Sequence, residues 1–140
     1  MKILVAVDSS GYAEDVLAEI AKRDWPGGTE FRLVTAIEKS TNWETEQDMS
    51  KSAEVLLNDR LHYLKKNIKN REIEGEVLVG AAPEMIVEYA RDWHANLIVI
   101  GAHGLSGTHK STVGSVAAAV VNTAPCSVEV VKAEPARVTG

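Results

Sequence analysis

The stretch LIVIGAHG, residues 97–104, decides the fold of this chain. Its first four residues are apolar and mostly β-branched, which is typical of a strand buried on both faces. The strand ends in a loop that contains glycines, and a second small-residue pair, Gly114-Ser115, opens a helical pattern rich in alanine and valine. We predict a buried strand, a glycine loop and a helix whose N-terminus faces that loop. Free N–H groups and the helix dipole at such an N-terminus favour phosphate.

Size and composition limit the classes of protein to consider. The chain has 140 residues, 45% of them hydrophobic and 25% charged, which fits one ordinary globular domain. Its net charge of −5 argues against general affinity for nucleic acid or anionic membranes. No apolar run approaches the roughly 20 residues of a membrane span, and no signal peptide precedes the first strand. We therefore expect a cytoplasmic protein without nucleic-acid or membrane partners.

Strand and helix patterns alternate along the whole chain. The first strand, residues 3–7, ends in Asp8-Ser9-Ser10, any of which could cap the following helix. Pro83 suits the first turn of a later helix, where its missing N–H costs nothing. The single cysteine, Cys126, is interpreted as a buried small side chain, with a reactive thiol as the alternative. Further strands are predicted over residues 31–37, 73–79, 97–100 and 127–131, and helices from about Ala13, Met49, Pro83 and Val113.

A polar stretch from Glu38 to about Asp48 lacks periodicity and is predicted to be a long surface loop. Within it, Trp43 is interpreted as a lid that packs on the body, with ligand stacking as the alternative. The long helix that follows should bury one apolar stripe. Its other face, which is interpreted as solvated, carries Lys51, Glu54, Asp59, Arg60, Lys65 and Lys66.

This alternation predicts a doubly wound α/β fold, with a five-stranded parallel sheet and helices on both faces. In the strand order 3-2-1-4-5, the order reverses between the first and fourth strands. Ligands of such sheets bind beyond the carboxyl ends of the strands at this point. Asp8 ends the first strand and Gly101 follows the fourth, so we expect both to line one crevice.

The spacing Gly101-x-x-Gly104, then nine residues, then Gly114-Ser115 resembles the signature of ATP-binding universal stress proteins. The segments 5–10 and 124–128 and the pair Gly80 and Pro83 fit the same family. The resemblance runs from Lys2 to Lys132, so we expect one domain over residues 1–132 and a flexible tail over residues 133–140. Ser9 departs from it, because family members commonly carry glycine at this position.

The resemblance implies an adenine nucleotide alpha hydrolase-like fold and an adenine-nucleotide site holding ATP, ADP or AMP, with any Mg²⁺ carried by the nucleotide. Asp8 and the backbone of Ala36 and Ile100 would line the adenosine. The glycines would permit close backbone approach and positive φ. The resemblance also implies a homodimer through the last strand, Ser127 to Val131. The complete set of candidate binding residues is Ala6, Val7, Asp8, Ser9, Ala36, Ile100, Gly101, His103, Gly104, Gly114, Ser115 and Val116.

Three functions stay open from the sequence. The first is a nucleotide-binding regulatory protein of the stress response; the others are a slow ATPase or self-phosphorylating protein, and a dimeric scaffold with a vestigial pocket. His103 could be a general base, but no nucleophile or paired carboxylate accompanies it, so a structural role is favoured and no catalytic residue is assigned. Lys110 either approaches the phosphates or is a solvated loop lysine. His109 has no assigned role.

Overall fold

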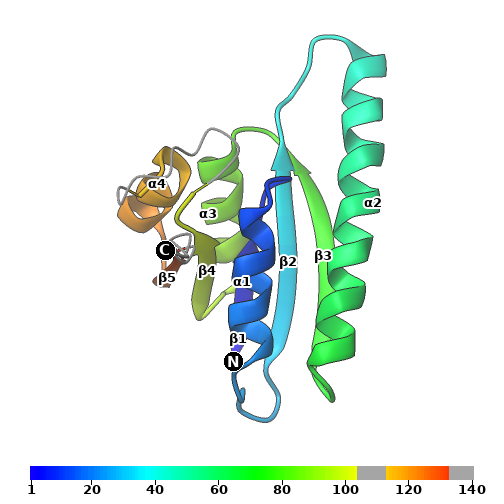
Figure 1. Cartoon of the computed structure of the whole chain (residues 1–140). Coiled ribbons are helices and arrows are strands. Elements are labelled where there is room, and N and C mark those ends of the chain that lie inside the picture. Colours follow the sequence, from blue (N-terminus) through cyan, green and yellow to red (C-terminus); the bar gives the residue numbers. More distant parts are fainter. Residues whose placement is uncertain (104–112, 133–140) are drawn as a thin grey trace, which may run out of the picture.

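A single parallel sheet forms the centre of the molecule (Figure 1). The computed structural model describes residues 1–103 and 113–132. The strand order is β3-β2-β1-β4-β5, and all neighbouring strands pair in parallel, which confirms the predicted fold class. The strands are β1 (Lys2–Ala6), β2 (Glu30–Ile37), β3 (Glu72–Val79), β4 (Leu97–Gly101) and β5 (Ser127–Val131).

Helices cover both faces of this sheet because its central strands are apolar on both sides. One core cluster joins residues of α1 (Tyr12–Ala21) and α2 (Trp43–Asn67) to one face. The second cluster joins α3 (Ala82–Trp93) and α4 (Ser115–Thr123) to the other face. In β1 and β4, the side chains of residues 3–6 and 98–100 are at most 5% exposed. The continuous apolar runs of the sequence therefore mark the strands that lie between two helical layers.

The first helix is capped by a residue other than the three that the sequence indicated. Gly11 is its N-cap, so none of Asp8, Ser9 and Ser10 occupies the capping position. Instead, Asp8 Oδ1 accepts hydrogen bonds from the backbone N of Ser10 at 2.9 Å and from Ser10 Oγ at 2.5 Å. The carboxylate thus closes a local turn, and this competes with the capping role.

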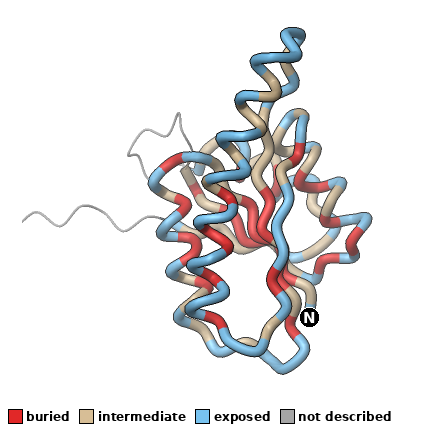
Figure 2. The backbone as a smooth tube through the Cα atoms, turned by 90° about the vertical axis from the view of Figure 1, so that its right-hand side faces the viewer, coloured by how far each residue is buried: buried red, intermediate tan, exposed pale blue. Residues whose placement is uncertain are grey.

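The second helix also corrects a prediction. It begins at Trp43, capped by Asn42, whose side chain accepts a hydrogen bond from the Thr45 N–H at 3.1 Å. The predicted loop therefore covers only residues 38–42. The Trp43 side chain is 72% exposed, so it is not a lid packed on the body. The first turns of α2 extend beyond the sheet and are largely exposed (Figures 1 and 2).

Arg60 was wrongly placed on the solvated face of α2. Its residue exposure is only 9%, close to that of its neighbour Leu61 on the buried stripe. Lys51, Glu54, Asp59, Lys65 and Lys66 are exposed, as predicted. The position of Arg60, three residues after Leu57 and four before Leu64, was the helical signal for burial.

The last helix buries less of its apolar stripe than its sequence indicated. Ala117 and Val120 are buried, whereas Val116 and Val121 are 37% and 50% exposed. Val113 lies before the helix and is 39% exposed. Within the described residues, no helix is both long and apolar enough to cross a membrane.

Candidate functional site

The predicted crevice lies at the carboxyl ends of β1 and β4. Ala6 pairs with Ile100 across these strands and with Val34 of β2 on its other side. The chain leaves β1 toward α1 on one face, while α4 lies on the other face with α3. This is the reversal of strand order at which doubly wound sheets hold ligands. The fold therefore places the segment after β1 beside the segment after β4.

Backbone hydrogen bonds hold the start of α4 against the end of β4. The N–H of Ala102 donates to the Val131 carbonyl at 2.8 Å, and the Ala102 carbonyl accepts from the Gly114 N–H at 2.7 Å. Gly114 is the N-cap of α4, and the Ala118 N–H donates to its carbonyl at 3.0 Å. That bond is the first within the helix. The helix therefore provides no acceptor for the N–H groups of its first three residues, Ser115, Val116 and Ala117. They are the donors that an anionic group at this end of β4 would meet.

Two glycines of the signature lie where a Cβ would crowd its neighbours. A Cβ on Gly114 would lie 3.0 Å from the Ala102 carbonyl oxygen. A Cβ on Gly101 would lie 3.3 Å from Val16 Cγ2 and 3.4 Å from the His103 carbonyl oxygen. The expectation of positive φ is wrong for both, since among the described glycines only Gly28 and Gly80 have it. Gly101 and Gly114 instead allow close approach within the protein.

The segment after β1 presents Asp8 and Ser9 at the same end of the sheet. Asp8 is half-buried and Ser9 is exposed. Val7 contributes less than predicted: its N–H donates to the Val34 carbonyl at 3.0 Å, and its side chain packs with the α1–α2 core. The side chains of Ala6 and Ile100 belong to the α3–α4 core and leave only their backbone for a ligand. Ala36 is half-buried beside the same core.

His103 lies against α1. Its ring centroid is 5.5 Å from that of Tyr12, with the two planes tilted by 51°. This contact agrees with the structural role favoured from the sequence. Gly104, His109 and Lys110 lie outside the described residues, as does the tail over residues 133–140. No group of three His, Cys, Asp or Glu side chains suited to a metal ion occurs within residues 1–103 and 113–132.

Arg60 of α2 reaches the segment after β1, which the sequence reasoning missed. Its Nη1 donates a short hydrogen bond to the Asp8 carbonyl, and its Nη2 donates to the Ser10 carbonyl at 3.2 Å. Burial lowers the pKa of the Arg60 guanidinium, while the negative charges of Asp8 and Glu14 act in the opposite direction. A guanidinium remains charged in proteins even so. A buried cation therefore holds the loop that carries Asp8.

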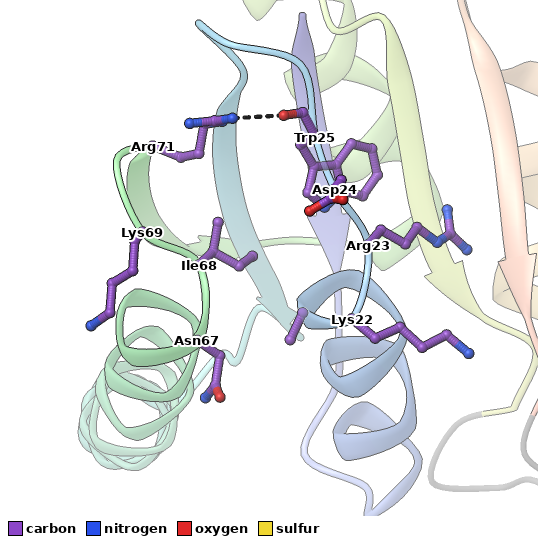
Figure 3. A pocket seen from close by; sticks show the side chains of 9 residues that line it. Lys22, Arg23, Asp24, Trp25, Asn67, Ile68, Lys69 and Arg71 are labelled. Carbon is purple, nitrogen blue, oxygen red and sulfur yellow. Dashed lines mark hydrogen bonds between the residues drawn. The ribbon is translucent and has the colours of Figure 1, made fainter.

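A pocket lies at the end of the sheet opposite to Asp8 and Gly101, between the C-terminal ends of α1 and α2 (Figure 3). Arg71 Nη2 donates to the Trp25 carbonyl at 2.6 Å and joins the turns before β2 and β3. Lys22 and Arg23 both pair with Glu19 and point away from Lys69. Because these cations diverge, the pocket does not form a convergent anion site.

The parallel sheet, its strand order and the helices on both faces define a doubly wound α/β protein. A sequence model of the universal stress protein family matches residues 1–132. A putative universal stress protein of Staphylococcus epidermidis is 32% identical over 145 residues, which cover 94% of this chain and 84% of the relative. The chain belongs to the universal stress protein family.

Solved structures show the same fold. The hypothetical protein MJ0577 superimposes with a TM-score of 0.87 at 23% identity, over 96% of this chain and 97% of the other. The universal stress protein from Archaeoglobus fulgidus in complex with dAMP is 28% identical, with a TM-score of 0.71 over 93% and 96% of the two chains.

Proposed function

We propose that this protein binds an adenine nucleotide at the switch point between β1 and β4 and acts as a regulator in the stress response. The observation that carries this proposal is the hydrogen bond from the Gly114 N–H to the Ala102 carbonyl, which sets the N-terminus of α4 beside the end of β4. The dAMP complex of the Archaeoglobus fulgidus relative supports an adenine nucleotide as ligand. The sequence places no nucleophile or paired carboxylate beside His103, so a binding role is favoured over a dedicated catalytic one.

In this proposal the two ends of the ligand meet different chemistry. Asp8 and the backbone of Ala36 and Ile100 line the adenosine, with Ala6, Val7 and Ser9 contributing from the same strand end. The N–H groups at the start of α4 and the Ser115 hydroxyl donate to phosphate oxygens. The phosphate-binding set is Gly101, Gly104, Gly114, Ser115 and Val116, with His103 beside it. ATP, ADP and AMP share this chemistry, and Mg²⁺ would arrive with the nucleotide.

The test is equilibrium binding to nucleotide-free protein. Calorimetric titration with ATP, ADP and AMP, each with and without Mg²⁺, is expected to show one saturable site per chain. Absence of binding at millimolar nucleotide, with an intact circular dichroism spectrum, would contradict the proposal. Release of ADP over hours, or phosphate added to the chain on incubation with Mg-ATP, would assign the alternative catalytic function.

We further propose that the protein is a homodimer paired through β5 and that it works in the cytoplasm. One side of β5 pairs with β4, which leaves its other side as a sheet edge. Val128 and Val130 are half-buried there, and α4 exposes Val116 and Val121 nearby in the fold. Such an edge favours pairing with a second strand. The free thiol of Cys126 suits a reducing compartment.

A further inference from the structure

The side chain of Arg60 reaches across 52 residues of sequence to the loop between β1 and α1. It comes from the middle of α2, on the stripe that also buries Leu57, Leu61 and Leu64. Its two Nη atoms donate to two carbonyls of this loop, those of Asp8 and Ser10. The planar guanidinium suits this task, because its donors form a rigid fork that spans two acceptors.

The loop that Arg60 holds is otherwise closed by local contacts. Asp8 Oδ1 accepts from the backbone and the hydroxyl of Ser10. The Ser10 carbonyl also accepts from the Ala13 N–H at 3.3 Å, in the first turn of α1. Ser10 is 8% exposed. Arg60 thus fixes the Asp8–Ser9 and Ser10–Gly11 peptide groups and joins α2 to the start of α1.

We infer that Arg60 is a positioning residue of the nucleotide site, which holds the Asp8 segment in the conformation that receives the adenosine end of the ligand. This inference rests on the proposed function. Arg60 acts through the backbone of Asp8 and Ser10 and makes no contact with the ligand itself. Without it, the Asp8 and Ser10 carbonyls lose the Arg60 hydrogen bonds, the Ser10 carbonyl keeps its bond from the Ala13 N–H, and the loop can move relative to the end of β4.

Arg60 also connects α2 to the proposed site. The half of α2 that follows Leu57 is packed on the sheet, whereas its first turns extend beyond the sheet and are largely exposed (Figure 2). Arg60 lies just inside the packed half. A shift of the Asp8 segment would therefore act on α2 at the base of its exposed part.

The experiment compares Arg60→Met, Arg60→Lys and the matched control Lys51→Met, which removes an exposed cation from the same helix. Methionine keeps the apolar stem but has no donor, while lysine keeps the charge without the fork. Affinity for AMP is measured by titration calorimetry. The amide ¹H and ¹⁵N shifts of Ser9 and Gly11, which belong to the two held peptide groups, are measured without nucleotide.

We expect Arg60→Met to weaken AMP binding at least tenfold and to shift both amides, with Arg60→Lys intermediate and Lys51→Met unchanged. Folded Arg60→Met protein that binds AMP like the wild type would overturn the inference. If Arg60→Met does not fold, Arg60→Lys decides it: wild-type affinity with unshifted amides would refute the role. Wild-type protein that binds no nucleotide overturns the proposed function, and unshifted amides in Arg60→Met would then refute the loop contact separately.

Discussion

Gly114 contributes both to the packing of the backbone at the end of β4 and to the proposed nucleotide site. Its N–H bonds to the Ala102 carbonyl at 2.7 Å, and a Cβ would stand 3.0 Å from the same oxygen. The close contact that holds α4 against β4 therefore leaves no room for a side chain. The requirement for glycine comes from this approach, because the φ of Gly114 is −65° and suits any residue.

Replacing Gly114 by alanine should push the backbones of Ala102 and Gly114 apart and move the α4 donors away from the phosphates. We expect Gly114→Ala to weaken adenine-nucleotide binding at least tenfold, or about 1.4 kcal/mol. The matched control is Gly27→Ala, because a Cβ on Gly27 meets nothing within 4 Å. Titration calorimetry with both variants checks the result. Equal affinities in two folded variants would contradict the steric argument.

Cys126 supplies a prediction on pH. Burial raises the pKa of its thiol, and a hydrogen bond with the Ile98 backbone opposes the shift in part. A raised pKa means less thiolate near neutral pH and slower alkylation than in the unfolded chain. We expect the alkylation rate of native protein to rise with pH around a higher midpoint than in urea. Intact-mass measurement of iodoacetamide labelling gives both midpoints, and coincident midpoints would show that burial does not protect the thiol.

At the scale of an element, α2 divides into an exposed beginning and a packed end. Leu57, Leu61 and Leu64 lie in the core between α2 and the sheet, whereas Val55 is 64% exposed. The exposed turns begin with the Asn42 cap and an acidic first turn, Glu44 and Glu46, which stabilise the N-terminal end of the helix. Packing therefore secures one half of α2, and local helix energetics support the other.

The two halves should respond differently to truncation. Leu64 is fully buried, so Leu64→Ala should lower the free energy of unfolding by about 2–5 kcal/mol through lost burial and a cavity. Val55→Ala should change it by no more than about 0.5 kcal/mol. Urea unfolding followed by circular dichroism measures both. A comparable loss from the two variants would mean that the start of α2 is packed in solution.

At the scale of the whole molecule, the two edges of the sheet differ in charge. On β3, Glu72, Glu74 and Glu76 are exposed on one face, opposite Glu30 and Arg32 on the neighbouring strand. Charges of this kind protect an edge from pairing with another chain. On β5, Glu129 is engaged by Arg23 at 2.8 Å, and Val128 and Val130 occupy the face shared with α4. The β5 edge is therefore the one suited to association.

Lysines on the β5 edge should separate the proposed dimer. We expect the double variant Val128→Lys and Val130→Lys to be a folded monomer, because like charges would face each other across the two-fold axis. Val79→Lys, on the β3 edge, serves as the control and should leave the assembly unchanged. Light scattering coupled to size-exclusion chromatography measures the mass. A wild-type monomer, or a double variant that stays dimeric, would contradict pairing through β5.

Much of the fold, and the expected place of the site, could be predicted from local patterns in the sequence. Apolar runs identified β1 and β4. The alternation of strands and helices predicted the order of the sheet, and this order places Asp8 and Gly101 at the carboxyl ends of neighbouring strands. The start of α2 was misread because Trp43 to Asp48 carry few apolar residues, and an exposed helix leaves no hydrophobic period. The N-cap of α1 was misread because Asp8 bonds Ser10 instead.

The sequence alone determined the class of fold and the family, and it predicted a ligand at the carboxyl ends of the strands, because periodicity and glycine spacing are local properties of the chain. Only the tertiary structure decided that Arg60 is buried and bonds to Asp8 and Ser10, and that Gly114 is held by Ala102. These contacts join segments separated by 52, 50 and 12 residues. No local pattern specifies which carbonyl a distant donor will meet, since that depends on how the helices pack on the sheet.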